Sequence, residues 1–82
     1  RPKGTLTVDD GAKKALCERG KSLLPPGIKE CTGKFSVGDV VRICDAVGGE
    51  FARGIAQHSA AEINGGGLAR TEVIHRDDLV IL

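Results

Sequence analysis

Hydrophobic residues recur along this chain with two different periods, and each change of period marks a predicted element. Residues 5–8, TLTV, alternate with a period of two and predict a short β-strand. From residue 10 the spacing becomes that of a helix with one apolar side. The apolar positions are Ala12, Ala15 and Leu16, and the predicted water-facing positions are Lys13, Lys14 and Glu18. Because Asp9 can cap the first turn and Gly20 can end the last one, we predict a helix over residues 10–19.

The rest of the chain predicts short strands divided by turns of glycine and proline. Further strands are expected at residues 28–32, 40–44, 50–59, 71–75 and 79–82. Gly48-Gly49 is a strong hairpin signal between the second and third of these, and Gly54 indicates a close backbone approach. A helical turn over residues 59–63, capped by Ser59, should end at the triple glycine of residues 65–67.

The proline pair Pro25-Pro26 separates the predicted helix from the strand that follows. It removes two backbone donors, so neither a helix nor an inner strand can pass through it. Leu23 and Leu24, just before the pair, are predicted to enter the core. Together the elements favour a mainly β fold with some α structure, namely about six short strands in a small barrel or sandwich with one or two flanking helices. A length of 82 residues predicts one domain, 1–82.

Composition adds constraints on origin and environment. The chain begins Arg1-Pro2-Lys3, which is no start of a primary translation product, so we expect a piece of a longer protein. No apolar run approaches the roughly 18–20 residues that cross a bilayer, and we expect no membrane contact. The cysteines Cys17, Cys31 and Cys44 are odd in number and widely spaced, which suits reduced thiols in the cytoplasm.

Charge is distributed unevenly although the net charge is only +1. Residues 1–34 hold eight basic and four acidic side chains, whereas residues 35–82 hold four basic and seven acidic ones. The basic first half is either a footprint for a polyanion such as RNA or a lysine-rich helix face in water. The candidate polyanion-binding residues are Lys13, Lys14, Arg19, Lys21 and Lys29. Since the chain has no Tyr or Trp for base stacking, such binding would be weak and directed at the phosphate backbone.

The triplet His75-Arg76-Asp77 matches the start of a protein-kinase catalytic loop. That loop also needs an Asn five positions after the Asp, and position 82 is Leu. It further needs a glycine-rich loop and an upstream strand lysine, which the chain lacks. We therefore predict a polar turn over residues 76–78, in which Asp77 and Asp78 accept backbone hydrogen bonds.

Other candidate motifs also fail on spacing. Gly65-Gly66-Gly67 fits neither a dinucleotide-binding nor a phosphate-binding loop and is interpreted as a connection. The three cysteines, His58 and His75 lack the spacing of zinc ligands, and nothing in their order pairs a cysteine with a base. We expect no catalytic residue, no bound cofactor and no metal in this chain.

Five segments in order carry a family resemblance: LTVDDGAKKAL, GKSLLPPGI, GKFSVGDVVRI, EFARGIAQHSAAEI and EVIHRDDLVIL. Together they resemble the C-terminal PUA domain of bacterial glutamate 5-kinases over nearly the whole chain. The resemblance implies a PUA fold, a mixed β pseudo-barrel with flanking helices. It also implies a parent enzyme that phosphorylates the γ-carboxylate of L-glutamate with ATP and Mg²⁺, the first step of proline biosynthesis in the cytoplasm.

The same resemblance implies that catalysis takes place in a different domain of the parent enzyme. The family's catalytic residues lie in an N-terminal amino-acid-kinase domain, which would be this domain's partner in a homo-oligomeric parent, so no catalytic residue carries over. A regulatory or interaction role for the PUA domain is then expected. Alternatively, PUA domains of RNA-modifying enzymes bind RNA through the first helix and following strand, here residues 10–34. The segment NGGGLART is shorter than the matching stretch of the family, either naturally or by engineering.

Overall fold

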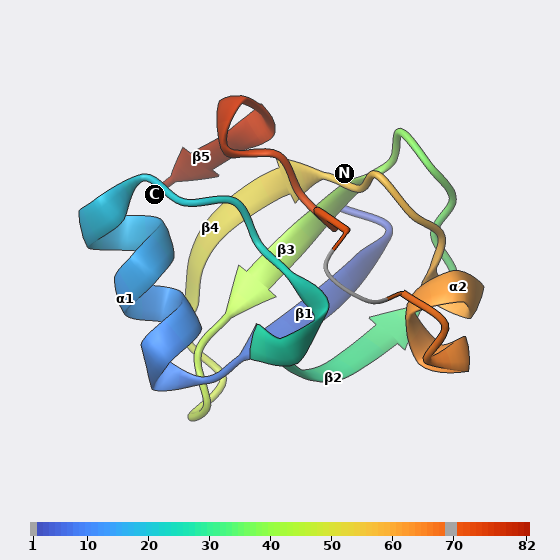
Figure 1. Cartoon of the computed structure of the whole chain (residues 1–82), viewed down its shortest axis with the longest axis horizontal. Helices are drawn as coiled ribbons and strands as arrows, with labels where there is room; N and C mark the ends of the chain where they lie inside the picture. Colours follow the sequence, from blue (N-terminus) through green and yellow to red (C-terminus); the bar gives the residue numbers. More distant parts are fainter. Residues whose placement is uncertain (1, 69–70) are drawn as a thin grey trace.

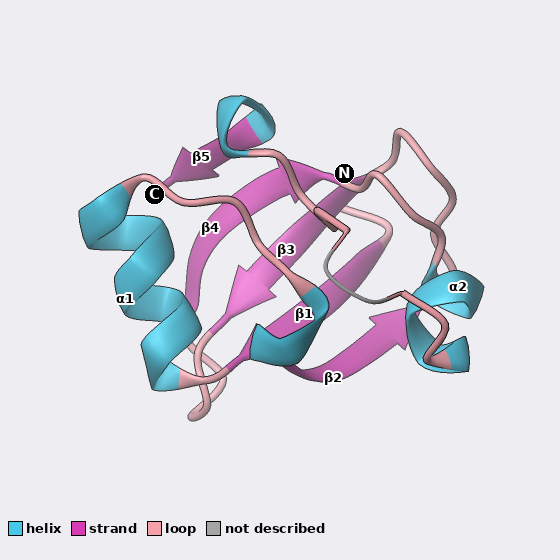
Figure 2. Ribbon diagram, viewed as in Figure 1, coloured by secondary structure: helices cyan, strands magenta, loops and turns pink. Residues whose placement is uncertain are grey.

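The computed structural model describes residues 2–68 and 71–82, built around one five-stranded sheet (Figure 1). The strands are β1 (Gly4–Val8), β2 (Ile28–Gly33), β3 (Val40–Cys44), β4 (Glu50–Ile55) and β5 (Leu79–Ile81). The helices are α1 (Asp10–Arg19) and α2 (Ala60–Gly65), with two 3₁₀ turns, η1 (Pro25–Gly27) and η2 (Arg76–Asp78) (Figure 2). The mainly β class predicted from the sequence is confirmed. In the described ranges, neither helix is long and apolar enough to cross a membrane.

The sheet has the order β2-β1-β3-β4-β5, which places the first strand of the chain inside it. β1 pairs antiparallel with β2 and parallel with β3, and the remaining pairs, β3 with β4 and β4 with β5, are antiparallel. β3 and β4 form the hairpin predicted at Gly48-Gly49, where Gly48 has a φ of +88° that favours glycine.

The core lies between one face of the sheet and the segments that cross it. The strand residues of that face with no exposed area are Leu6, Val8, Val41, Ile43 and Ala52. Leu16 of α1 packs into the same cluster. Residues 20–27 and 71–78 cross in front of the sheet, and they meet at a β-bridge between Leu23 and Ile74 (Figure 1). Leu23 is buried as predicted, while Leu24 is half-buried.

Both predicted helices form, and local capping explains their limits. The Asp9 carboxylate accepts a hydrogen bond of 2.7 Å from the Ala12 backbone N–H, and Gly20 ends α1 with a φ of +59°. In α2, Ser59 and Glu62 form a reciprocal capping box. Because these signals lie within a few residues of each helix end, the bounds of α1 match the prediction and α2 differs by one or two residues.

The prediction of a strand over 71–75 is wrong. The backbone of Val73 forms hydrogen bonds with two different segments. Its N–H donates to the Leu23 carbonyl, and its carbonyl accepts from the Gln57 N–H, each at 2.8 Å. No ladder follows, and the only pairing is the bridge at Ile74. The strand expected over 50–59 ends at Ile55, since β3 begins opposite it at Val40.

The sheet is consequently open, with five strands where about six in a barrel were predicted. The order of the described sheet leaves β2 and β5 at its two edges. The crossing segments 20–27 and 71–78 cover the core face, but between them they contribute one bridge and no full strand. They shield the core without joining the edges.

Candidate functional site

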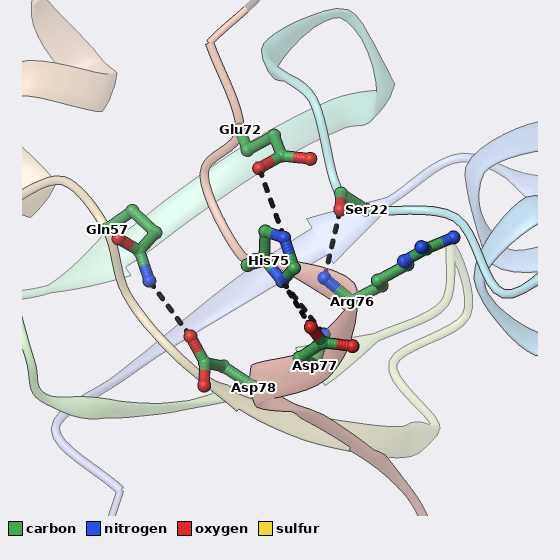
Figure 3. Close-up of polar contacts among 7 residues, drawn as sticks. All are labelled: Ser22, Gln57, Glu72, His75, Arg76, Asp77 and Asp78. Carbon is green, nitrogen blue, oxygen red and sulfur yellow. Dashed lines mark hydrogen bonds and ion pairs between the residues drawn. The ribbon is translucent and has the colours of Figure 1, made fainter.

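The His75-Arg76-Asp77 triplet forms the entrance to η2 (Figure 3). His75 is the N-cap, and its Nδ1 accepts a hydrogen bond of 3.0 Å from the Asp77 backbone N–H. The ring lies between two carboxylates, with Nε2 3.8 Å from Glu72 Oε1 and Nδ1 3.6 Å from Asp77 Oδ2. The cap acceptor is therefore the imidazole, which corrects the prediction that Asp77 and Asp78 would accept the backbone bonds of this turn.

Two further hydrogen bonds tie η2 to distant parts of the chain. The Arg76 backbone N–H donates to Ser22 Oγ at 2.9 Å, and Gln57 Nε2 donates to Asp78 Oδ2 at 3.1 Å. The Arg76 side chain extends away from the other labelled residues (Figure 3). These contacts hold residues 75–78 against the crossing segment over residues 20–27 and against the residues that follow β4. The triplet therefore has a structural role that requires no substrate.

A polar hollow of about 550 Å³ opens beside this turn. It is lined by Gln57, His58, Thr71, Glu72, His75 and Asp78. The His58 Nδ1 to Glu62 Oε1 distance is 3.7 Å, so the imidazole–carboxylate contacts in and beside the hollow are longer than hydrogen bonds. Within residues 2–68 and 71–82, no three His, Cys, Asp or Glu side chains converge on a point where a metal ion could bind.

Among the candidate polyanion-binding residues, Lys13 is already engaged. Its Nζ donates to Asp45 Oδ2 at 3.0 Å and lies 5.2 Å from the centre of the Phe51 ring. The hydrogen bond to Asp45 raises the pKa of Lys13, and the same bond, with one from the Gly49 N–H, lowers the pKa of Asp45. Lys13 keeps 38% of its side chain exposed, as predicted for a water-facing position, but its ammonium group is paired with Asp45 in the β3–β4 loop.

The other four candidates are exposed but divide into two groups. The start of α1 contacts η1, since the Asp9 N–H donates to the Gly27 carbonyl at 3.0 Å, and Lys29 follows this contact. Arg19 and Lys21 lie at the other end of the helix, roughly 15 Å away for ten residues. Lys14 lies between them on the exposed side. The four are therefore dispersed over α1, the segment after it and β2, and Lys14 and Arg19, five residues apart, point about 140° apart around the helix.

Sequence reasoning missed two arginines on the face of the sheet opposite the core. Arg42 of β3 and Arg53 of β4 are direct partners in the antiparallel pair, and both are exposed. Arg53 donates from Nε to Glu50 Oε2. Alternation within each strand could have placed each arginine outward, but only the register brings the two together.

Comparisons with known proteins agree with this architecture. The PUA domain family matches residues 4–76. The glutamate 5-kinase of Syntrophotalea carbinolica is 47% identical over 92 aligned positions, covering 96% of this chain and 25% of that protein. That of Geobacter metallireducens is 43% identical over 95 positions, covering 100% of this chain and 26% of the relative. The chain thus spans about a quarter of the length of the curated relatives it matches.

Solved structures resemble the fold as well. A PUA domain from Aeropyrum pernix superposes with a TM-score of 0.81 at 30% identity, over 90% of this chain and 41% of the other. A conserved PUA domain protein from Thermoplasma acidophilum gives 0.72 at 27% identity, over 85% and 46% of the two chains.

The alignments also bear on chain length. The Geobacter metallireducens match runs over 95 positions although this chain has 82 residues, so at least 13 positions of the alignment have no counterpart here. This agrees with a chain that is shorter than its relatives within the aligned region. Residues 69–70 of the segment NGGGLART, like residue 1, lie outside the described residues.

Proposed function

The chain belongs to the PUA domain family, and from this premise we propose that it is the non-catalytic PUA domain of a glutamate 5-kinase. The observation that carries the proposal is identity of 40–47% with eight glutamate 5-kinases over nearly the whole chain. The parent would transfer phosphate from ATP with Mg²⁺ to L-glutamate in the cytoplasm. This domain would act in regulation or interaction beside the amino-acid-kinase domain.

Local geometry supports a role without chemistry. The one kinase-like triplet uses its histidine as a helix cap, with the Arg76 backbone bound to Ser22. In the adjacent hollow, Nδ1 of His75 already accepts the Asp77 backbone N–H, so this nitrogen serves the turn.

The test is nucleotide binding by the 82-residue chain. Isothermal titration with ATP and Mg²⁺ up to millimolar concentration should give no binding heat, and the chain should form no glutamyl phosphate. A dissociation constant in the micromolar range, or turnover of glutamate, contradicts the proposal. A titration with the parent enzyme provides the positive control.

A second candidate function is RNA binding, favoured by four exposed basic residues in the first half of the chain, Lys14, Arg19, Lys21 and Lys29. The variant Lys14→Glu/Lys21→Glu/Lys29→Glu should lose affinity for a fluorescein-labelled RNA hairpin in an anisotropy titration. The slope of log affinity against log salt should fall by about 2–3, as expected for three lost phosphate contacts.

The matched control for this titration reverses three charges elsewhere. Lys3, Arg42 and Lys34 are exposed basic residues outside that set of four. Changing these three to Glu alters the net charge equally and should leave most of the RNA affinity. Equal losses in both triple variants mean that Lys14, Lys21 and Lys29 have no special role in RNA binding.

A further inference from the structure

The cap of η2 differs in chemistry from the caps of the two α-helices. Side-chain oxygens of Asp9 and Ser59 accept a backbone N–H group from the first turn of α1 and of α2. At η2 the acceptor is Nδ1 of His75, 3.0 Å from the backbone nitrogen of Asp77. An imidazole nitrogen accepts a hydrogen bond only while it carries no proton. The cap of η2 therefore exists only while the His75 ring is neutral.

The same hydrogen bond fixes where the ring of His75 holds its proton. A neutral imidazole has one N–H donor and one acceptor nitrogen. Because Nδ1 is the acceptor, the proton is on Nε2, which faces Glu72 (Figure 3). A ring rotated by 180° about its bond to Cβ would exchange Nδ1 with a carbon and leave the Asp77 N–H without this acceptor. The cap thus selects one tautomer and one orientation of the ring.

Two carboxylates lie close enough to stabilise the ring when it is charged. Nε2 is 3.8 Å from Glu72 Oε1, and Nδ1 is 3.6 Å from Asp77 Oδ2. Both distances are longer than a hydrogen bond, so neither contact is fully made in the capped arrangement. An imidazolium carries a proton on each nitrogen, so it can donate to both carboxylates in charge-assisted hydrogen bonds. The neutral ring and the charged ring therefore prefer different partners.

Other charged groups around His75 do not replace these partners. The titratable or charged residues on the surrounding elements are Glu72, Arg76, Asp77 and Asp78 of its own segment, His58 after β4, Glu62 of α2 and Lys21 of the crossing segment. The Arg76 side chain extends away from the ring (Figure 3). His58 lies 3.7 Å from Glu62, and Asp78 accepts from Gln57. A charged His75 ring thus meets carboxylates next to both of its nitrogens.

We propose that His75 is a pH-sensitive switch that closes and opens the cap of η2. With a neutral ring, Nδ1 holds the Asp77 N–H and the turn is capped. With a charged ring, this N–H is released and the ring donates to the carboxylates of Glu72 and Asp77. Histidine is the side chain whose charge ordinarily changes between about pH 5 and 8, so the change falls in that interval. The proposal does not depend on the assignment to glutamate 5-kinase.

The change should stay within the turn and alter the surface beside it. The hydrogen bonds between Leu23 and residues 73–74 involve no titratable group, so they hold the crossing segments together in both states. Glu72 and His75 both line the polar hollow of about 550 Å³. A partner that approaches this hollow therefore meets a carboxylate without a countercharge when the ring is neutral, and an ion pair when the ring is charged.

Nuclear magnetic resonance of the ¹⁵N-labelled 82-residue chain, titrated between about pH 8 and pH 5, tests the proposal. At the upper end, the His75 ring should show an unprotonated Nδ1 and a protonated Nε2. As the ring becomes charged, the Asp77 amide should lose the shift of a hydrogen-bonded proton, with the same midpoint as the ring. Its protection against solvent exchange, corrected for the intrinsic rate, should fall by a factor of about five, as for other lost caps. The Val73 amide, which donates to the Leu23 carbonyl, should keep its protection.

The variant His75→Asn separates the cap from the charge. Asparagine is a preferred capping residue, its Oδ1 is attached to Cγ as Nδ1 is in histidine, and it does not titrate. In this variant the Asp77 amide should stay hydrogen-bonded over the whole titration. His58→Gln is the matched control at the other histidine and should leave the His75 transition unchanged.

Four results overturn the switch. The first is a protonated Nδ1 on His75 at the upper end of the titration, and the second is a ring that stays neutral at the lower end. The third is an Asp77 amide that keeps its hydrogen bond although the ring is charged. The fourth is an Asp77 transition that persists in His75→Asn, which would assign it to another titrating group. The first three are measured on the wild-type chain, so they do not depend on the folding of any variant.

Discussion

Replacing Gly54 by valine is expected to leave this domain unfolded at 37 °C. A Cβ atom built at this position would lie 2.6 Å from Ile74 Cγ2 and 3.2 Å from the Asp78 carbonyl oxygen. Ile74 is fully buried and Asp78 O belongs to the backbone, so neither can move aside easily. Overpacking costs about 1–3 kcal/mol for added methylenes and more for a branched side chain against backbone. The whole domain has only roughly 4–12 kcal/mol of stability at about 0.05–0.15 kcal/mol per residue.

Thermal unfolding followed by circular dichroism measures this effect. Gly54→Ala should retain a transition at a clearly lower Tm, and adding Ile74→Leu, which removes the offending Cγ2 methyl, should return part of the loss. Gly65→Ala is the matched control, because a Cβ at that helical position meets no atom within 4 Å. A Gly54→Val variant with the wild-type Tm would show that Ile74 can move away from β4 at little cost in free energy.

Leu23→Ala is expected to destabilise the domain by about 2–5 kcal/mol, as for other buried leucines. Leu23 is 1% exposed and belongs to the core cluster, and its backbone exchanges hydrogen bonds with the segment around Ile74. Removing its side chain leaves a cavity at the point where the two crossing segments meet above the sheet. Urea denaturation gives the free energy of unfolding directly.

The neighbouring leucine supplies the control for this experiment. Leu24 is half-buried and lies outside the core cluster, so Leu24→Ala should cost clearly less than Leu23→Ala. Equal losses at the two positions would mean that Leu24 is packed as deeply as Leu23.

Much of the local structure was readable in the sequence. Asp9 and Gly20 set the limits of α1, Ser59 started α2, and Gly48-Gly49 marked the hairpin. Each of these signals acts through hydrogen bonds or dihedral angles within about four residues, which a linear pattern contains. The close approach indicated by Gly54 was also correct, although its partner Ile74 could not be named.

The candidate site depended on contacts between distant residues. Lys13 meets Asp45 across 32 positions, and Arg76 meets Ser22 across 54. The Arg42–Arg53 pair depends on the strand register, which one residue of slip would reverse. Charge counting identified a basic first half, but it could not show that Lys13 is engaged or that Lys29 and Arg19 are far apart.

By itself, the sequence determined the two helices, four of the five strands nearly to their ends, the mainly β class and the family. The tertiary structure alone decided that residues 71–75 form a bridge in place of a strand, and that the sheet stays open. The physical reason is the range of the forces. Caps and turns are settled by neighbouring residues, whereas a strand exists only where a partner's hydrogen-bonding groups are free, and that partner lies elsewhere in the chain.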